Sequence, residues 1–161
     1  MSKHAVQVIG IALIMLVIGF VALWLREPIL VPSVASASAL QLLTPEEKAA
    51  QPWNIAVGQL IGLVAAIVMV RLLGAADAPS FMGHNPLLVS RVGASALAAG
   101  ITAALQIATK STCAAGGTLA LTVTLGAETP DWAGFARAVA GIALVTLLGE
   151  LGRRAVLKAK G

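Results

Sequence analysis

The chain has 161 residues, of which 58% are hydrophobic and 11% are charged, and its net charge is +4. A mean hydropathy of +0.93 and long uncharged runs indicate an integral membrane protein rather than a soluble domain. The positive charge does not indicate a nucleic-acid-binding protein, because tyrosine is absent and the cations stand at the ends of apolar segments rather than in basic runs interleaved with aromatic residues.

The first apolar segment follows a short stretch with one lysine. Residues Ala5 to Leu25 carry no charge, and at about 1.5 Å per residue they span the roughly 30 Å of hydrocarbon in a bilayer. A cleavable signal peptide is the alternative, because Ser33 to Ser38 contain a small-x-small pattern. The apolar run exceeds a signal core of about 7–15 residues, and Arg26 and Glu27 precede that pattern, so we expect a retained crossing.

Five more apolar segments follow, three long and two short. The long ones, about Trp53–Leu73, Leu88–Thr109 and Ala133–Leu151, are each near the roughly 20 residues of a spanning helix. The short ones, Pro28–Leu43 and Ser111–Ala127, are predicted to be re-entrant or broken helices, with a loop or a surface-lying helix as the alternative. The predicted fold class is therefore an all-α membrane protein, a single domain with four transmembrane helices plus two short re-entrant or broken helices.

The basic residues predict an orientation when they are sorted on alternate sides of four crossings. The side that holds both termini then carries seven of them: Lys3, Arg71, Arg91, Arg153, Arg154, Lys158 and Lys160. The other side carries four: Arg26, Lys48, Lys110 and Arg137. Because cytoplasmic loops are enriched in Lys and Arg, we expect both termini in the cytoplasm.

The two halves of the chain can be placed over one another by a single shift without gaps. The segment "PSVASASALQLL" (Pro32–Leu43) then lies over "STCAAGGTLALT" (Ser111–Thr122). Each half has a long helix, a short small-residue segment, an acidic polar loop, a tryptophan and another long helix. We therefore expect two structural repeats, at about 5–73 and 88–152, as in transporters whose sites lie where interrupted helices meet near the midplane. The pattern leaves parallel and inverted repeats equally open.

Gly116 and Gly117 predict a buried turn at the second short segment. Within hydrocarbon a non-helical turn survives only inside protein or beside a water-filled cavity, and glycine lets the backbone approach a ligand closely. A half-helix that begins near Thr118 would direct its N–H groups and positive dipole end at a small anion. The alternative is that these small residues only allow close helix packing, and one segment can serve both purposes.

A few polar side chains within or beside the spans are further candidates. Lys110 and Arg91 are cations near span ends, where they could face a cavity or extend to the interface. The amides Asn54, Gln59 and Gln106 could contact a polar solute or form hydrogen bonds between helices.

Nothing in the sequence indicates an enzyme. Paired intramembrane carboxylates, a histidine cluster, a Ser-His-Asp set and a phosphate-binding loop are all missing from it. The single cysteine, Cys113, cannot form an intramolecular disulfide and has no second Cys or His at metal-ligand spacing. We therefore expect no catalytic residue, no metal site and no cofactor.

The residues quoted above resemble the HPP family of small bacterial and plastid membrane proteins. The segment Ala50–Val68 is similar to the first half of that family, most specifically at Gln51–Asn54. The segment "TCAAGGTLALTVTLGAE" stands where the family has its His-Pro-Pro-(Gly/Ala)-Gly-Ala-Thr signature. Here Cys113–Ala115 replace the tripeptide, and Gly116–Thr118 continue the pattern. The likeness extends over about Pro28–Leu151 and implies four spans in the cytoplasmic (inner) membrane of a bacterium, with nitrite transport implicated for some members.

Together these features predict a transporter or permease for a small solute, such as the small anion nitrite. The predicted substrate-binding residues are Ser36, Ser38, Asn54, Gln59, Lys110, Gly116, Gly117 and Thr118. The expected partners are the lipid bilayer, the small solute or anion and further copies in a homo-oligomer, without nucleic acid. The alternative is a non-transporting membrane subunit or scaffold that packs against another membrane protein through its small-residue faces.

Overall fold

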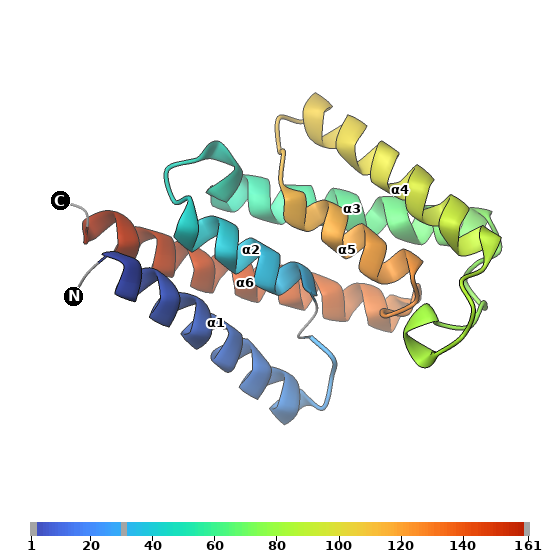
Figure 1. The fold of residues 1–161 in the computed structure, drawn as a ribbon, viewed down its shortest axis with the longest axis horizontal. Coiled ribbons are helices and arrows are strands. Elements are labelled where there is room, and N and C mark those ends of the chain that lie inside the picture. Colours follow the sequence, from blue (N-terminus) through green and yellow to red (C-terminus); the bar gives the residue numbers. More distant parts are fainter. Residues whose placement is uncertain (1–2, 30–31, 160–161) are drawn as a thin grey trace.

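The fold is a bundle of six α-helices in a computed structural model that describes residues 3–29 and 32–159 (Figure 1). The helices are α1 (Lys3–Leu25), α2 (Pro32–Leu43), α3 (Pro52–Leu72), α4 (Val89–Ala108), α5 (Ala114–Thr124) and α6 (Trp132–Lys158). Two 3-10 turns, Lys48–Ala50 and Phe81–Gly83, lie in the connections before α3 and α4. The all-helical prediction is confirmed for this part of the chain.

Four of the helices are long and apolar enough to cross a membrane. They are α1 from His4 to Leu25, α3, α4 and α6, and the shortest of them has 20 residues. The two helices between them, α2 and α5, have 12 and 11 residues. At 1.5 Å per residue each is about 17 Å long, roughly half of the hydrocarbon thickness. The predicted four long spans and two short helices are therefore present.

Four helices end at a residue in the left-handed region. These residues are Arg26, Gly74, Lys110 and Gly126, with φ between 53° and 82°. After each of them the next N–H group donates to the carbonyl five residues earlier, as in Ser111 N to Gln106 O at 2.9 Å. This arrangement satisfies the last carbonyls of a helix and turns the chain sharply.

The start of α6 is held by a side-chain cap. Asp131 accepts a hydrogen bond from the Gly134 N–H at 2.6 Å and another from the Thr129 hydroxyl at 2.9 Å. The Gly134 N–H, followed by the Thr129 hydroxyl, lowers the pKa of Asp131 below its ordinary value. A lowered pKa in the folded state means that the carboxylate stabilises the fold above about pH 4 and loses this effect as the pH falls through the folded-state pKa.

We expect Asp131→Asn to weaken this pH dependence, because asparagine also caps helices but does not titrate. Thermal unfolding at pH 7 and pH 3 measures it. The wild-type melting temperature should fall further between the two pH values than that of the variant. An equal fall in both proteins would show that the Asp131 carboxylate does not stabilise the start of α6.

The chain reverses direction at every connection, so that successive helices run antiparallel (Figure 1). At one end, which we call the terminal end, α1 begins and α6 ends. There Gln7 Nε2 donates to Leu42 O at 2.9 Å and Arg153 Nη1 donates to Pro45 O at 3.0 Å, which places the end of α2 beside both. At the opposite end Arg71 Nη2 donates to Pro130 O at 2.7 Å, which joins the end of α3 to the start of α6.

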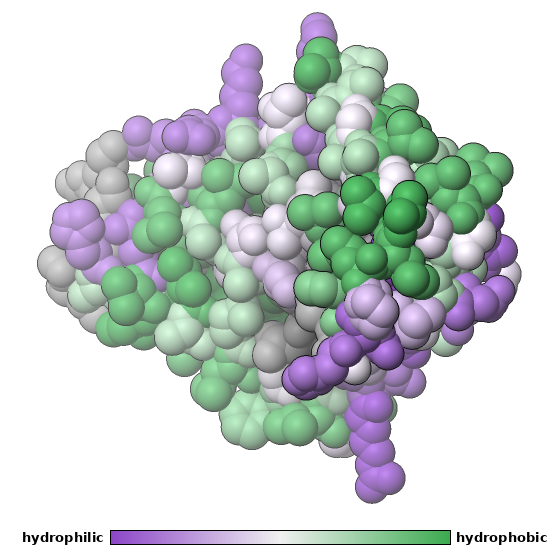
Figure 2. Space-filling view, turned by 45° about the vertical axis from the view of Figure 1, so that its right-hand side comes forward, coloured by the Kyte–Doolittle hydropathy of each residue, from purple (hydrophilic) through white to green (hydrophobic). Residues whose placement is uncertain are grey.

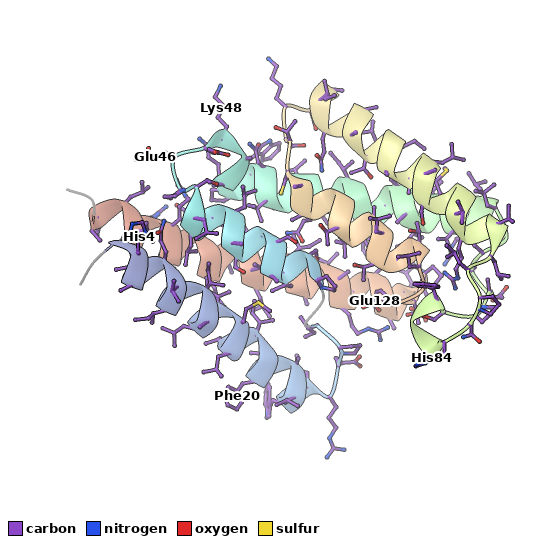
Figure 3. The ribbon with its side chains drawn as sticks, in the orientation of Figure 1. His4, Phe20, Glu46, Lys48, His84 and Glu128 are labelled. Carbon is purple, nitrogen blue, oxygen red and sulfur yellow. The ribbon has the colours of Figure 1, made fainter. Side chains whose placement is uncertain are left out.

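These helix directions change the assignment of basic residues to the two sides, which the sequence analysis based on four crossings. Because α2 and α5 also advance along the bundle, Lys48 and Lys110 belong to the terminal end, and Arg71 and Arg91 belong to the opposite end. Figure 3 shows His4 and Lys48 in the left half of the view, with Glu128 and His84 in the right half. The excess of basic positions beside the termini is unchanged, because two residues move in each direction.

Each half of the chain packs mainly against the other half. In the first half, α1 to α3, helix α3 packs against α4 and α5, and in the second half α6 packs against α1 and α2. The short helices α2 and α5 lie side by side in the middle of the bundle (Figure 1). Ile55 and Leu63 of α3 belong to two buried apolar clusters, the first shared with α1, α2, α5 and α6, and the second with α4, α5 and α6.

The outer surface of the bundle is apolar. Large side chains on α1 and at helix starts are widely exposed, including Phe20 at 62%, Trp24 at 84% and Trp132 at 83%. Figure 2 shows broad hydrophobic areas, with hydrophilic residues gathered mainly toward the edges of the molecule. Such a surface suits contact with lipid tails, whereas an aqueous protein rarely exposes so large an apolar area.

Candidate functional site

The start of α5 crosses the middle of α3 at backbone contact. Gly62 is the central residue of α3, and a Cβ atom placed there would collide with the carbonyl of Gly116. A Cβ atom at Gly116 would collide in turn with the carbonyl of Gly58. Three glycines therefore bring a short helix against a spanning helix as closely as two backbones allow. Gly116 therefore allows close helix packing, which was the alternative to a ligand site for this residue.

The backbone before α5 is held by the side chain of Gln106 from α4. Its Nε2 donates to Gly58 O and to Cys113 O, both at 3.0 Å, and its Oε1 accepts from the Cys113 N–H at 3.1 Å. Cys113 is extended at the N-cap position of α5, and its side chain is buried. Gln106 thus forms hydrogen bonds between helices, and it fixes the point at which α5 begins.

Gln59 is a buried amide without a hydrogen-bond partner. It is 0% exposed, and neither Nε2 nor Oε1 has a partner within the described residues. It lies on α3 between Ile55 and Leu63, one turn away on either side, and both of these side chains are fully buried in the interior clusters. Leaving both amide atoms unpaired costs about 1–3 kcal/mol, so Gln59 is an expensive residue to keep in an apolar interior.

Three other predicted site residues form hydrogen bonds locally. Ser38 is fully buried and donates to Val34 O at 2.9 Å, one turn earlier in α2. Ser36 donates to Pro32 O at 3.2 Å in the same helix. Asn54 donates to Lys48 O and holds the 3-10 turn before α3. A solute could engage these groups only by sharing or replacing those bonds.

The remaining predicted residues lie around the start of α5. Gly117 is partly buried and has open space where a Cβ atom would stand, in contrast to Gly116. Thr118 is partly buried and donates to Ala114 O at 3.3 Å within its helix. Lys110 is exposed in the connection from α4 to α5. The structure therefore brings Gly116 to α3, but it places Lys110 at the surface.

The cavities identified around the described residues lie elsewhere. A groove of about 780 Å³ follows α1 and is lined mainly by apolar side chains such as Leu16 and Phe20. A cavity of about 150 Å³ at the opposite end is lined by Arg91, Ser80 and Glu128 among others. Since Gln59 is fully buried, a solute can reach it only after neighbouring helices separate.

Arg91 is a buried clamp at the opposite end, and of its two expected placements it lines a cavity rather than extending to the interface. It is 3% exposed, and it donates to Thr124 O at 2.7 Å, to Pro79 O at 2.9 Å and to Ala78 O. The guanidinium thus covers the negative end of the α5 dipole and holds the connection before α4. Hydrogen bonds to these three carbonyl groups therefore fix the position of the Arg91 guanidinium.

Sequence reasoning missed a charged network at the same end. Arg137 bonds to Glu27 at 3.2 Å, to Glu128 at 2.8 Å and to the Thr129 hydroxyl at 2.8 Å. Glu128 is almost fully buried, whereas Glu27 is about half exposed. Arg137 and Glu27 are 110 positions apart in the sequence, so their contact could not be predicted from local sequence patterns.

The sequence pattern of the HPP transmembrane region matches residues 1–157, nearly the whole chain. The chain belongs to the HPP family. No curated protein and no solved structure matches it significantly. The resemblance over Pro28–Leu151 is therefore confirmed, and it extends through α1 and most of α6.

The HPP signature position has a defined place in this fold. Cys113, Ala114 and Ala115 form the N-cap and the first two residues of α5. The following Gly116 is the residue in contact with α3. The segment that resembles the family signature therefore lies where α5 begins, beside the middle of α3.

Proposed function

We propose that this HPP protein is a permease for a small polar solute, with a small inorganic anion such as nitrite as the leading candidate. The observation that carries the proposal is the side chain of Gln59, which is fully buried and has no hydrogen-bond partner among the described residues. An amide offers both hydrogen-bond donors and acceptors. A solute in the interior would supply the hydrogen-bond partners that Gln59 lacks.

The positions of the short helices support the preference for an anion. The start of α5 lies beside Gly58 and Gly62, in the middle of a spanning helix, so its positive dipole end lies within the hydrocarbon depth. The start of α2 is placed similarly, because Ile29 and Val34 lie against the position that a Cβ atom of Gly141 in α6 would take. Two such helix ends in the interior favour negative charge.

We further propose that the two halves are inverted structural repeats, each with one broken span. Support comes from the directions of the helices, since α1 and α4 begin at opposite ends of the bundle, as do α2 and α5, and α3 and α6. The reciprocal packing of each half against the other also supports this. In transporters of this kind, the two halves move against each other around a site near the midplane.

In this proposal Gln59 is the main polar contact, and Gly117 and Thr118 line the path beside it. Gly116 and Asn54 position the helices, while Ser36 and Ser38 exchange their local hydrogen bonds for the solute. Lys110, at the terminal end, raises the local concentration of anions. We infer no enzymatic activity and no cofactor.

We propose that the protein lies in the bacterial cytoplasmic membrane with α1 beginning and α6 ending on the cytoplasmic side. Support comes from the excess of basic positions at that end. A chain of this size encloses little interior volume on its own, so assembly into a homo-oligomer is part of the proposal.

The experiment is uptake into liposomes that contain the purified protein. Nitrite, nitrate and formate are tested at equal concentration, with empty liposomes of the same lipid as the control. We expect uptake of at least one of these anions above the control. If none enters faster than in empty liposomes, the permease proposal fails.

A non-transporting membrane subunit is the second candidate function. It is favoured by the small-residue crossings, such as the one at Gly62 and Gly116, which show how closely this chain can pack a helix. Purification in a mild detergent distinguishes the two proposals. A stoichiometric foreign membrane protein, together with absent uptake, would support the subunit, whereas purification of the chain alone would not.

A further inference from the structure

Two of the contacts that join the halves of the chain lie on opposite sides of the middle of the bundle. At the opposite end, Arg137 of α6 bonds to Glu27, which follows α1, with Nη1 and Oε2 3.2 Å apart. Toward the terminal end, Gln106 of α4 bonds to Gly58 of α3, with Nε2 and O 3.0 Å apart. Each contact links a residue at or just after the end of the first helix of one half to the third helix of the other half.

The two contacts occupy equivalent positions. The shift that places Ser111 over Pro32 also places Gln106 over Glu27 and Arg137 over Gly58. The two bonded pairs are observed in the structure, whereas the shift was found in the sequence alone, so the two observations are independent. The same place in each half therefore bonds to the same place in the other half, on opposite sides of the middle of the bundle.

We propose that these contacts are a pair of latches that close the two ends of the interior and open alternately. This inference rests on the proposed permease function. We call the Glu27–Arg137 pair the ionic latch and the Gln106–Gly58 pair the amide latch. Gln59 directly follows Gly58 and is fully buried. In this proposal, a solute reaches it from either end only when one latch separates.

The chemistry of the two latches differs, and this makes them respond differently. The ionic latch is partly solvated, since the Arg137 side chain is 18% exposed and that of Glu27 is 46% exposed. Arg137 keeps its bonds to Glu128 and Thr129 within the second half, so only the Glu27 bond must break when the halves part. The amide latch is buried and uncharged, and salt should affect it less.

The single cysteine of the chain reports on the amide latch. Cys113 is 3% exposed, and its N–H and carbonyl are both bonded to the Gln106 side chain. Its thiol should react with a maleimide only when the terminal end opens. The rate of alkylation in full-length protein in liposomes therefore measures how often the amide latch separates, without any added label site.

The decisive variant is Glu27→Arg, which places two cations at the ionic latch and favours opening of the opposite end. Asp77→Arg is the matched control, because Asp77 is an exposed carboxylate in the connection between α3 and α4. If the latches open alternately, Cys113 alkylation in Glu27→Arg should slow by about tenfold. The rate in Asp77→Arg should equal that of wild type. Gln106→Leu should react faster than wild type.

Two outcomes would overturn the latch proposal. An unchanged rate in Glu27→Arg would mean that the two ends are not coupled, and a faster rate would mean that the substitution only loosens the bundle. Uptake of nitrite by the wild-type protein is measured separately. Slower alkylation without any anion uptake would contradict the permease function and leave the latches standing, whereas uptake with an unchanged alkylation rate would contradict the latches alone.

Discussion

Replacing Gln59 by leucine is expected to stop solute movement and to make the folded protein more stable. The amide is fully buried with both polar atoms unpaired, so an apolar side chain of similar size removes a desolvation cost of about 1–3 kcal/mol. The same change removes the donors and acceptors that the solute would meet, and we expect uptake to fall by about 10- to 100-fold. If Gln59 served only to stabilise the fold, its replacement would not raise stability while lowering uptake.

Gln106→Leu is the matched control for Gln59→Leu, because Gln106 is also a buried amide in a spanning helix but forms three hydrogen bonds. Its loss leaves the Cys113 N–H unpaired and removes the second hydrogen bond of Gly58 O and Cys113 O, which should destabilise the fold by about 1–3 kcal/mol. Thermal unfolding in detergent should therefore show melting temperatures that move in opposite directions. A lower melting temperature for Gln59→Leu would contradict the assignment of Gln59 to solute contact.

Adding one methyl group at each of two adjacent glycines is expected to give opposite results. Gly116→Ala directs the new Cβ atom at the Gly58 carbonyl, a backbone atom that cannot turn away. We expect a loss of about 3 kcal/mol or more, because overpacking against backbone forces the helices apart. Gly117→Ala meets open space in the same helix and should be neutral or stabilise by about 0.5–1 kcal/mol.

Expression, monodispersity in detergent and melting temperature measure this difference. Gly62→Ala supplies a second test, since its Cβ atom would meet the Gly116 carbonyl from the other side of the same crossing. Gly116→Ala and Gly62→Ala should behave alike, and Gly117→Ala should behave like wild type. Equal tolerance at all three positions would show that the backbone contact between α3 and α5 is not required.

The spanning helices could be predicted from the sequence because hydropathy summed over the length of a membrane crossing is a strong signal. The run from Ala5 to Leu25 corresponds to α1, and the short segments correspond to α2 and α5. The directions of the helices could not be derived in this way. An orientation based on four crossings assigned Lys48 to the side away from the termini. It assumed that the short segment before Lys48 returns to the side on which it begins, whereas α2 advances along the bundle.

The candidate site was harder to predict, because it depends on which face of each helix is buried. Composition marks Gly116 and Gly117 equally, yet one contacts backbone and the other faces open space. Gln59 and Gln106 are both amides within spans, and only the structure separates the bonded one from the unbonded one. Hydropathy carries no information about such pairings.

The partners of Arg137 could not be predicted from the sequence alone. The shift that relates the two halves places Arg137 over Gly58 and Gln106 over Glu27. Each of these residues looks ordinary by itself, and a cation near the start of a span is commonly placed at the interface. The pairing becomes visible only when the contacts between the two halves are known from the structure.

The most direct test of the central claim is the concentration dependence of nitrite uptake by liposomes that contain the wild-type protein. Transport through an interior that holds one solute at a time must saturate as the nitrite concentration rises. We predict an initial rate that exceeds that of empty liposomes and reaches a plateau. A rate equal to that of empty liposomes, or one that rises linearly without a plateau for nitrite, nitrate and formate alike, would contradict the account.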